Sequence, residues 1–328
     1  MLSEGFDIDT VDLNILTPQT DEFSTSAALI RGVSAALAKS GYSIGGFDAY
    51  TTSNVPSGAG LSSSAAFEVM VGAIQNHFFN NGVVKAEDIA KFSQYAECDF
   101  FGKPCGLMDQ TACSVGGFTA IDFKNPKEPV IEKVDFDFSA HNHTLCIVNI
   151  GVSHADLTDD YADIMSECRA VAKCFDKTVL REVNEEDFYK SISNVRNKTG
   201  DRAVLRAMHF FAENSRAVKA KEVLLNNDFL EFLSIIKESG NSSYKYLQNV
   251  YSNSNVHSQG ISLALAITEK YLGDRGAFRV HGGGFAGTIA AFVPNELLNG
   301  YIQEIESVFG KKSCYTLNIR NKGAHKII

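Results

Sequence analysis

The sequence predicts an α+β protein of two lobes, and two observations support this prediction. The chain has 328 residues, of which 45% are hydrophobic, and this is enough apolar material for a core in each of two domains. Segments with strand character gather in the first half, whereas long helical patterns dominate beyond Gly151. We therefore expect one domain over residues 1–155, a second over residues 156–328, and a cleft between them.

The first half alternates helical and strand patterns after an extended, acidic segment over residues 1–22. Apolar residues recur at helical spacing over residues 25–40 and again from Ala65 to Ile74, which predicts two helices. Between these helices, the alternation over residues 46–55 is typical of a strand. The predicted elements are helices over 25–40, from 65 onward and over 86–99, and strands over 46–55, 117–123 and 144–150.

Longer helical patterns follow in the second half, where Ile164, Cys168 and Val171 share one face of the first helix. A strand pair around residues 276–293 is split by three consecutive glycines, and a helix and a strand close the chain. The predicted helices cover 157–175, 201–225, 228–250, 258–272 and 295–309, and the last predicted strand covers 313–319.

Composition argues against several classes of function. The net charge is −9 and no basic run occurs, so nucleic acid is not an expected partner. No apolar run reaches the ~18 residues typical of a membrane helix, so we expect no membrane span. The seven cysteines form no Cys-x-x-Cys pair, which indicates free thiols rather than disulfides or a zinc site. We therefore expect a cytoplasmic protein.

The stretch over residues 55–69 has the pattern of a phosphate-binding loop. Gly58 and Gly60 allow close approach of the backbone, and the serine motif Ser62–Ser64 follows at the predicted start of a helix. The unpaired N–H groups and the positive dipole end of a helix start favour anions. The implied ligand is a phosphate chain, most simply that of ATP.

This loop differs from the common nucleotide-binding motifs. A Walker loop needs a lysine before its Ser or Thr, and no Lys or Arg lies between Lys39 and Lys85. The dinucleotide fingerprint needs a glycine where Ser63 stands, and no protein-kinase signature occurs. We therefore expect backbone N–H groups, hydroxyls and Mg²⁺ to balance the phosphate charge. Taken alone, the pattern also fits an ordinary Gly/Ser turn that starts a helix.

Two further constellations indicate chemistry. Asp109 lies in the mostly apolar run of residues 104–112, where a partly desolvated carboxylate is a candidate general base or an electrostatic partner for a reacting hydroxyl. The alternative role for Asp109 is a helix cap or a turn residue. Residues 279–293 hold three consecutive glycines and Gly287, which indicate close approach of a ligand or of backbone, or else a glycine-rich hairpin.

Together the three motifs resemble those of the GHMP kinase superfamily, and within it the galactokinases. Pro56–Ala66 is similar to the phosphate loop of that family, Cys105–Gln110 to its Cys-Gly-Ile-Met-Asp-Gln motif, and Gly282–Gly287 to its glycine-rich third motif. The run from His154 to Tyr161 resembles the segment that leads to a sugar-contacting tyrosine. The resemblance implies a mixed α/β sandwich domain, a helix-rich ferredoxin-like α+β domain, and an active site in the cleft between them.

The resemblance also implies a reaction and roles for individual residues. ATP would phosphorylate galactose to galactose 1-phosphate with Mg²⁺ as cofactor, and the protein would mainly position reactants and stabilise spread charge. Asp109 would lie beside the sugar C1 hydroxyl as base or charge stabiliser, while Gly106 and Tyr161 would contact the sugar. Ser64 and Glu97 would hold Mg²⁺. The other implied site residues are Gly58, Gly60, Leu61, Ser62, Ser63, Ser64 and Ala65 for the phosphates, and Gly282, Gly283 and Gly284 in a motif that shapes the site.

One galactokinase feature does not occur in this sequence. The signature close to Gly-Arg-x-Asn-Leu-Ile-Gly-Glu-His-x-Asp-Tyr is absent, and in the family it supplies an arginine near the reacting hydroxyl and side chains that bind the sugar hydroxyls. We therefore expect this polypeptide to bind MgATP weakly and to phosphorylate galactose poorly or not at all. Without the early strands of that segment, an exposed sheet edge would favour self-association.

Two alternative functions stay open on the sequence. Another GHMP kinase would act on a different sugar, on homoserine or on mevalonate, although the Met108-Asp109-Gln110 context favours galactokinase. A non-catalytic protein that binds a sugar or a nucleotide is compatible with the missing signature. The joint presence of the serine motif and Asp109 favours catalysis.

Overall fold

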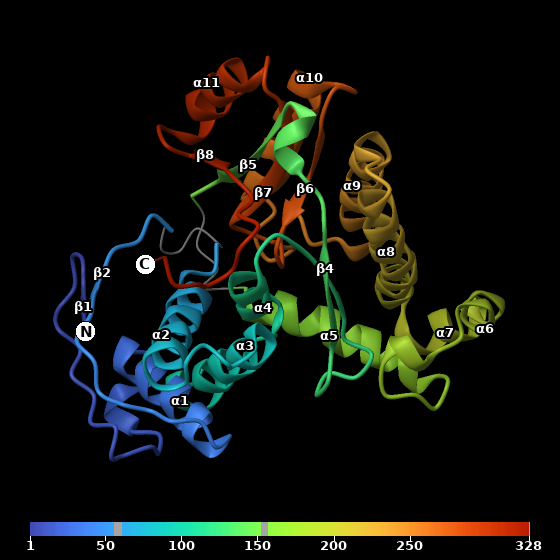
Figure 1. Ribbon diagram of the computed structural model, residues 1–328. Coiled ribbons are helices and arrows are strands. Elements are labelled where there is room, and N and C mark those ends of the chain that lie inside the picture. The colour runs from blue at the N-terminus through green and yellow to red at the C-terminus, as the bar shows by residue number, and fades with distance from the viewer. Residues whose placement is uncertain (56–60, 152–156, 328) are drawn as a thin grey trace. The chain divides into compact units, whose positions relative to one another are not determined.

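A computed structural model describes residues 1–55, 61–151 and 157–327 of the chain (Figure 1). Helices and short strands both occur along it, as expected for an α+β protein. The chain separates into two compact units, one of Met1–Val134 with Ile319–Ile328 and one of Asp135–Asn318.

The boundary between the units differs from the sequence prediction, which placed it between residues 155 and 156. Strand β5 (His143–Asn149) pairs with two later strands of the second unit, so it belongs to that unit. The C-terminal tail belongs to the first unit, where the Gly117 amide donates to the carbonyl oxygen of Arg320 over 2.8 Å. Sheet pairing and the position of the tail therefore set the division.

Helices α1 to α4 build the first unit around a shared core. Val33 and Leu37 of α1, Val69 of α2 and Ile89 of α3 are buried in it. The predictions of α1, α2 and α3 are confirmed, because their apolar residues at helical spacing face this core. Helix α4 was not predicted, since a short helix gives little periodic signal. The bounds are α1 (Ser26–Lys39), α2 (Ser63–Phe79), α3 (Ala86–Tyr95) and α4 (Met108–Val115).

Helix α3 continues as a π-helix, Ala96–Phe101, where the sequence predicted an ordinary helix up to Asp99. Helix α1 crosses this segment closely, because a Cβ on Gly32 would lie 2.7 Å from the Cβ of Ala96. Gly102 ends the π-helix with a φ of 86°, and its amide donates to the carbonyl oxygen of Glu97. π-Helices are rare and frequently accompany functional sites.

The strands of the first unit are short. Strand β1 (Leu2–Ser3) pairs in parallel with β2 (Tyr50–Thr51), and β3 (Phe118–Asp122) pairs antiparallel with β4 (Val130–Val134). The strand predicted over residues 46–55 is therefore reduced to two paired residues, although burial still alternates along much of it. Its partner β1 offers only two residues for pairing, so the ladder cannot extend.

Arg31 of α1 ties the acidic N-terminal segment to the first unit. Its buried guanidinium pairs with Glu22, in the 3-10 helix Thr20–Glu22, and donates to the carbonyl oxygens of Asp12 and Ile15. A planar group with several donors can satisfy a carboxylate and two carbonyls at once. This single side chain therefore fixes a segment that lacks regular structure over most of its length.

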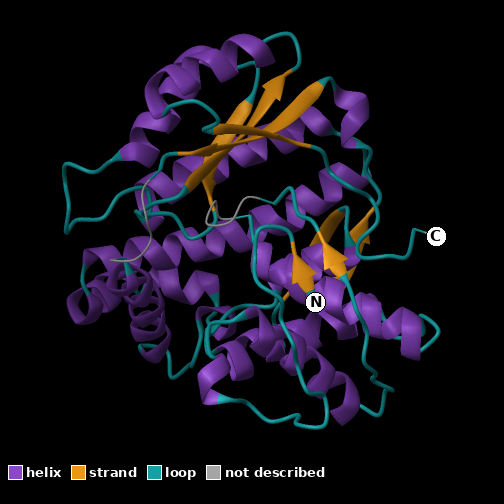
Figure 2. Cartoon of the chain, turned by 90° about the vertical axis from the view of Figure 1, so that its left-hand side faces the viewer, coloured by secondary structure: helices purple, strands orange, loops and turns teal. Residues whose placement is uncertain are grey.

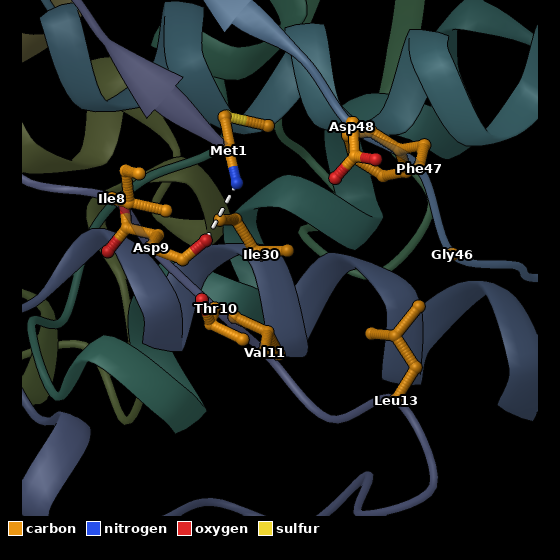
Figure 3. Close-up of a pocket in the computed structure, with 10 residues that line it drawn as sticks. All are labelled: Met1, Ile8, Asp9, Thr10, Val11, Leu13, Ile30, Gly46, Phe47 and Asp48. Carbon is orange, nitrogen blue, oxygen red and sulfur yellow. Dashed lines mark hydrogen bonds between the residues drawn. The ribbon is translucent and has the colours of Figure 1, made fainter.

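A cavity of about 400 Å³ lies at the same N-terminal segment (Figure 3). The close-up shows the Met1 amine facing the carbonyl oxygen of Asp9, to which it donates over 2.7 Å. The Asp9 carboxylate accepts from the Ser26 hydroxyl over 2.6 Å, which joins the segment to the start of α1. None of the site residues predicted from the sequence lines this cavity.

The second unit is built on a four-stranded antiparallel sheet of order β6-β7-β5-β8, and Figure 2 draws its strands in orange. In chain order, these strands and two long crossovers give a β-α-β-β-α-β pattern, which is the ferredoxin-like arrangement. The ferredoxin-like prediction is therefore confirmed. The remaining bounds are β6 (Ala277–His281), β7 (Thr288–Pro294), β8 (Cys314–Leu317), α10 (Gly260–Leu272) and α11 (Leu298–Phe309).

Helices α10 and α11 pack on this sheet through one hydrophobic cluster. Ile261 of α10 and Tyr301 and Ile305 of α11 are fully buried against Val148 and Ile289 of the central strands. The Tyr301 hydroxyl and the Thr268 hydroxyl lie 2.9 Å apart, so the buried phenol has a hydrogen-bond partner. The cluster confirms the helices predicted at 258–272 and 295–309.

The crossover from β5 to β6 contains further helices with a core of their own. Val171, Phe188, Val195 and Ala207 come from four of these helices and are fully buried in one cluster. The helix predicted over 228–250 is broken at Ser243, where a π-helix begins. No helix in the described part of the chain has the length and apolar character to cross a membrane. The 3-10 helix Phe138–His141 precedes β5. The crossover contains α10 and the 3-10 helix Leu180–Glu182, helices α5 (Thr158–Lys173), α6 (Glu185–Lys190), α7 (Ile192–Thr199), α8 (Asp201–Leu225) and α9 (Phe229–Ser242), and the π-helix Ser243–Leu247.

Candidate functional site

The start of α2 has no capping side chain from the residue before it. Ser62 stands before the helix with φ 57° and ψ 49°, and its hydroxyl makes no capping hydrogen bond. The first-turn amides of a helix lack intrahelical acceptors and are the donors that bind anions at helix starts. Ser63, Ser64 and Leu61 are half-buried around this start. The predicted contacts Gly58 and Gly60, and His154, lie outside the described residues.

Asp109 lies against the serine motif. Its Oδ2 accepts a hydrogen bond from the Ser62 hydroxyl over 2.6 Å, and Asp109 stands in the first turn of α4. The expected desolvation of this carboxylate is wrong, because Asp109 is exposed. Helix α4 buries the face that carries Gln110 and Thr111, and Asp109 falls outside it. Gly106 is exposed as well.

Glu97 is buried, with 3% of its side chain exposed, and three donors hold its carboxylate. The Ser64 hydroxyl and Lys103 Nζ donate to Oε1 over 3.0 and 2.9 Å, and Gln110 Nε2 donates to Oε2 over 2.7 Å. From the sequence, the family resemblance implied that Glu97 holds Mg²⁺, and the other interpretation of a glutamate at this position is a solvated helix residue. The structure instead joins it to Ser64, the other predicted metal ligand.

Ser64 and Glu97 fit a cation of the Mg²⁺ type. A hydroxyl and a carboxylate are hard oxygen donors, and Mg²⁺ typically adds waters and substrate phosphate oxygens to one or two protein carboxylates. The described residues contain no group of three or more His, Cys, Asp or Glu side chains that could hold a metal ion. Phosphate oxygens and water would therefore have to supply the other ligands.

Sequence reasoning missed Gln110 and Glu68, which lie behind Glu97 as a second layer. Gln110 Nε2 lies 3.2 Å from Oε2 of Glu68, and both residues are buried. Burial, and next the charge of Glu97, raises the pKa of Glu68 to about 8. Oε1 of Glu68 and Oε1 of Gln110 have no hydrogen-bond partner in the described structure. A glutamate within an otherwise apolar helix pattern was the available signal.

A cavity of about 410 Å³ adjoins the start of α2. Its walls mix hydroxyl groups with apolar side chains, so it can accept a ligand with a flat apolar body and polar edges. The residues that line it are Ser3, Glu4, Phe6, Ser26, Thr51, Thr52, Ser53, Val55, Ser63, Ala66, Phe67 and Met70.

Tyr161 and the glycine motif lie together in the second unit. The Tyr161 hydroxyl donates to the carbonyl oxygen of Gly284 over 2.8 Å, and a Cβ on Gly283 would lie 2.6 Å from the Tyr161 ring. Burial raises the pKa of Tyr161. The glycines lie in the connection of the β6–β7 hairpin, which is the alternative that the sequence left open, and protein atoms approach Gly283 and Gly284 closely.

Asn249, a residue that sequence reasoning missed, holds the backbone of the same motif. Its Nδ2 donates to the carbonyl oxygen of Gly283 over 2.9 Å, and its own carbonyl oxygen accepts from the Phe285 amide. Gly284 has a φ of 81°, and a Cβ there would lie 2.0 Å from the carbonyl oxygen of Asn249. Gly282 differs, because a Cβ on it would meet nothing within 4 Å.

Comparison with protein families gives a match in the first unit. Residues 27–117 match the family described as GHMP kinases N terminal domain. This segment runs from α1 through α4 and contains Ser62, Ser64, Glu97 and Asp109. The motifs quoted from the sequence for the first unit therefore lie inside the matched region.

Comparison with solved structures shows the fold along most of the chain. A Lactococcus lactis galactokinase complexed with galactose superposes with a TM-score of 0.75 at 21% identity, over 96% of this chain and 80% of that chain. An L. major mevalonate kinase in complex with R-mevalonate superposes with a TM-score of 0.55 at 12% identity, over 90% of this chain and 78% of that chain. A homoserine kinase from Cytophaga hutchinsonii superposes with a TM-score of 0.53 at 15% identity, over 95% of this chain and 81% of that chain.

Proposed function

We propose that the chain is an ATP-dependent sugar kinase and that galactose is its acceptor; the match of residues 27–117 to the family described as GHMP kinases N terminal domain supports this proposal. The proposed reaction transfers the γ-phosphoryl group of ATP to the C1 hydroxyl of galactose. The hydrogen bond between Ser62 and Asp109 is the observation that supports it most, since it brings a helix start that suits phosphate and a candidate base into one site. The likeness to a galactokinase solved with galactose supports the choice of acceptor.

The first turn of α2 binds the phosphates in this proposal. Its amides and the positive end of the helix dipole favour the negative charge of the β- and γ-phosphates. The hydroxyls of Ser62, Ser63 and Ser64 add donors in the same place. The cavity of about 410 Å³ beside Ser63 and Ala66 takes the nucleoside, whose flat base suits its apolar walls and whose polar edges suit its hydroxyls.

Ser64 and Glu97 hold the Mg²⁺ that accompanies ATP. Bound Mg²⁺ neutralises phosphate charge and helps to orient the transferring group. The protein keeps the Glu97 carboxylate in place through Gln110, which binds the oxygen that faces away from Ser64. Second-layer hydrogen bonds of this kind orient metal ligands.

Asp109 acts on the acceptor hydroxyl. Its carboxylate is exposed, so a sugar hydroxyl can reach Oδ2 by replacing the Ser62 hydroxyl. In that position the carboxylate takes the hydroxyl proton or stabilises the charge that develops during transfer. Tyr161 and Gly106 are proposed sugar contacts.

Nucleotide binding and acceptor choice can be tested separately. Calorimetric titration with MgADP should show binding to the wild-type protein and to Asp109→Asn, because Asp109 serves the acceptor. The variant Glu97→Gln should bind MgADP at least tenfold more weakly, since it loses the anionic metal ligand. A folded wild-type protein that shows no binding of MgADP would contradict the proposed function.

The acceptor is then identified by turnover with a panel of galactose, glucose, mannose, homoserine and mevalonate. We expect a phosphorylated product with galactose, detected by ³¹P NMR as a sugar 1-phosphate. A product formed only with homoserine or mevalonate would support the proposed kinase activity but overturn galactose as the acceptor. The variant Asp109→Asn serves as the inactive control for each acceptor.

A further inference from the structure

Lys103 occupies the solvent side of the buried Glu97 carboxylate. Its Nζ lies 2.9 Å from Oε1 of Glu97, the same oxygen that accepts from Ser64. The Lys103 side chain is 63% exposed, whereas that of Glu97 is 3% exposed. The ion pair therefore joins a mostly exposed side chain to a buried one.

The backbone places Lys103 at this position. The amides of Gly102 and Lys103 both donate to the carbonyl oxygen of Glu97, the latter over 3.0 Å. The turn that ends the π-helix thus attaches the lysine to the residue whose carboxylate it pairs with. The ammonium can swing into solvent while the main chain stays in place.

The other oxygen of Glu97 is closed to an incoming cation. Oε2 accepts from Gln110 Nε2 over 2.7 Å, and Gln110 is 1% exposed. A divalent ion that uses Ser64 and Glu97 must therefore approach Oε1, where the ammonium lies. Mg²⁺ coordinates oxygen at about 2.0–2.1 Å, so the ammonium and the ion would repel each other at that oxygen.

We propose that Lys103 is a resident cation that compensates the buried Glu97 carboxylate and is displaced by the divalent ion of the nucleotide complex. This inference rests on the proposed function, because it assumes that Glu97 is a metal ligand. A buried carboxylate without a partner is strongly unfavourable, and Lys103 supplies the partner while no metal is bound. Lys103 therefore competes with the metal and sets its apparent affinity.

The inference predicts that loss of the ammonium tightens metal binding. Lys103→Met keeps the apolar stem and should lower the dissociation constant of Mn²⁺ in the presence of ADP by about fivefold, the size of one partly exposed ion pair. Lys103→Arg keeps a cation and should not tighten binding. The readout is the electron paramagnetic resonance signal of free Mn²⁺, which falls as the ion binds and requires no turnover.

Two controls test whether the effect acts through Glu97. Lys190→Met removes another exposed lysine, 67% exposed and paired with Glu186, and should leave Mn²⁺ binding unchanged. In a Glu97→Gln background, Lys103→Met should have no effect, because neither cation then has a carboxylate to bind. Circular dichroism checks that each variant is folded.

Each outcome decides the matter. Unchanged or weaker Mn²⁺ binding by Lys103→Met overturns the inference and leaves the proposed function standing, provided that the wild type binds Mn²⁺ and ADP. Weaker binding of metal-free ADP by Lys103→Met would make Lys103 a phosphate contact and also overturn it. A wild-type protein that binds neither Mn²⁺ nor ADP would contradict the proposed function and the inference together.

Discussion

Glu68 is a carboxyl group in surroundings that disfavour its charge. Its side chain is fully buried on α2, and burial, with the charge of Glu97 as the second cause, raises its pKa to about 8. Glu68 is therefore protonated in the folded chain near neutral pH, whereas glutamates of unfolded chains ionise near pH ~4.3. The two states of the chain bind different numbers of protons between these values.

This difference predicts a pH dependence of stability. The free energy of unfolding should fall as pH rises from about 5 to about 8, because the folded chain keeps a proton that the unfolded chain has released. One group contributes at most about 1.4 kcal/mol per pH unit. Glu68→Gln cannot ionise and should have a flatter profile, which urea unfolding at several pH values measures.

The control for this prediction is Glu186→Gln. Glu186 is an exposed carboxylate, with 76% of its side chain accessible, and the variant should keep the wild-type slope. Profiles of wild type and Glu68→Gln that superimpose across the whole range would show that Glu68 is not held protonated.

At the residue scale, several of the site residues predicted from the sequence lie in contact in the structure. Ser62 and Asp109 are joined by a hydrogen bond, and so are Ser64 and Glu97. The serine motif and Asp109 could be picked out by their residue types and surroundings in the sequence, whereas Glu97 was implied only by the family resemblance. The contact of Gln110 with Glu68 spans 42 positions of the chain, so it depends on how α4 packs against α2 and was not accessible.

At the scale of elements, two glycines of the β6–β7 connection allow the cost of backbone strain to be measured separately from the cost of a steric collision. Gly282 and Gly284 have φ values of 67° and 81°, so a side chain at either position is strained. They differ in surroundings, because only a Cβ on Gly284 would collide with the carbonyl oxygen of Asn249. The pair therefore isolates the packing contribution.

We expect Gly284→Ala to destabilise the protein more than Gly282→Ala. The left-handed conformation should cost about 1–2 kcal/mol in both variants, and the collision at residue 284 should add about 1–3 kcal/mol. Urea unfolding measures both losses. Equal losses in the two variants would mean that Asn249 does not constrain the motif.

Element predictions succeeded where a long apolar period faces a core. The helix predicted over 201–225 has the same bounds as α8, because 25 residues give a clear period. The π geometry at 96–101 was missed, since its sequence pattern resembles that of an α-helix. The segment packs closely on Gly32 of α1, a long-range contact that the sequence does not reveal. This irregular segment carries Glu97, which is a proposed metal ligand.

At the scale of the whole molecule, the second unit is continuous in sequence. Asp135–Asn318 contains two hydrophobic clusters made wholly of its own residues, one on the sheet and one in the long crossover. The first unit, in contrast, combines two separate chain segments. A continuous chain segment with its own hydrophobic core can in principle fold independently.

We expect the fragment 135–318 to fold without the rest of the chain. It should unfold cooperatively in urea, with a helical circular dichroism spectrum, because its cores need no residue of the first unit. The matched fragment 1–134 lacks the tail that packs at Gly117 and should be less stable than its counterpart in the full chain. A non-cooperative transition for fragment 135–318 would contradict the division into units.

The sequence could predict the α+β class and the ferredoxin-like unit, but not the boundary between units. The C-terminal tail has no pattern that assigns it to the first unit, since its docking rests on backbone contacts at Gly116 and Gly117. Likewise, β5 reads as one more strand of the first half until its partners β7 and β8 are known. Long-range pairing decides both cases, and it leaves little local signal.

The measurement that tests the central claim most directly is release of ADP from MgATP with and without galactose. The account predicts galactose-dependent release that Asp109→Asn abolishes, because Asp109 lies against the serine motif at the start of α2. Release that ignores galactose, or that persists in a folded Asp109→Asn variant, would contradict a sugar kinase centred on Ser62 and Asp109.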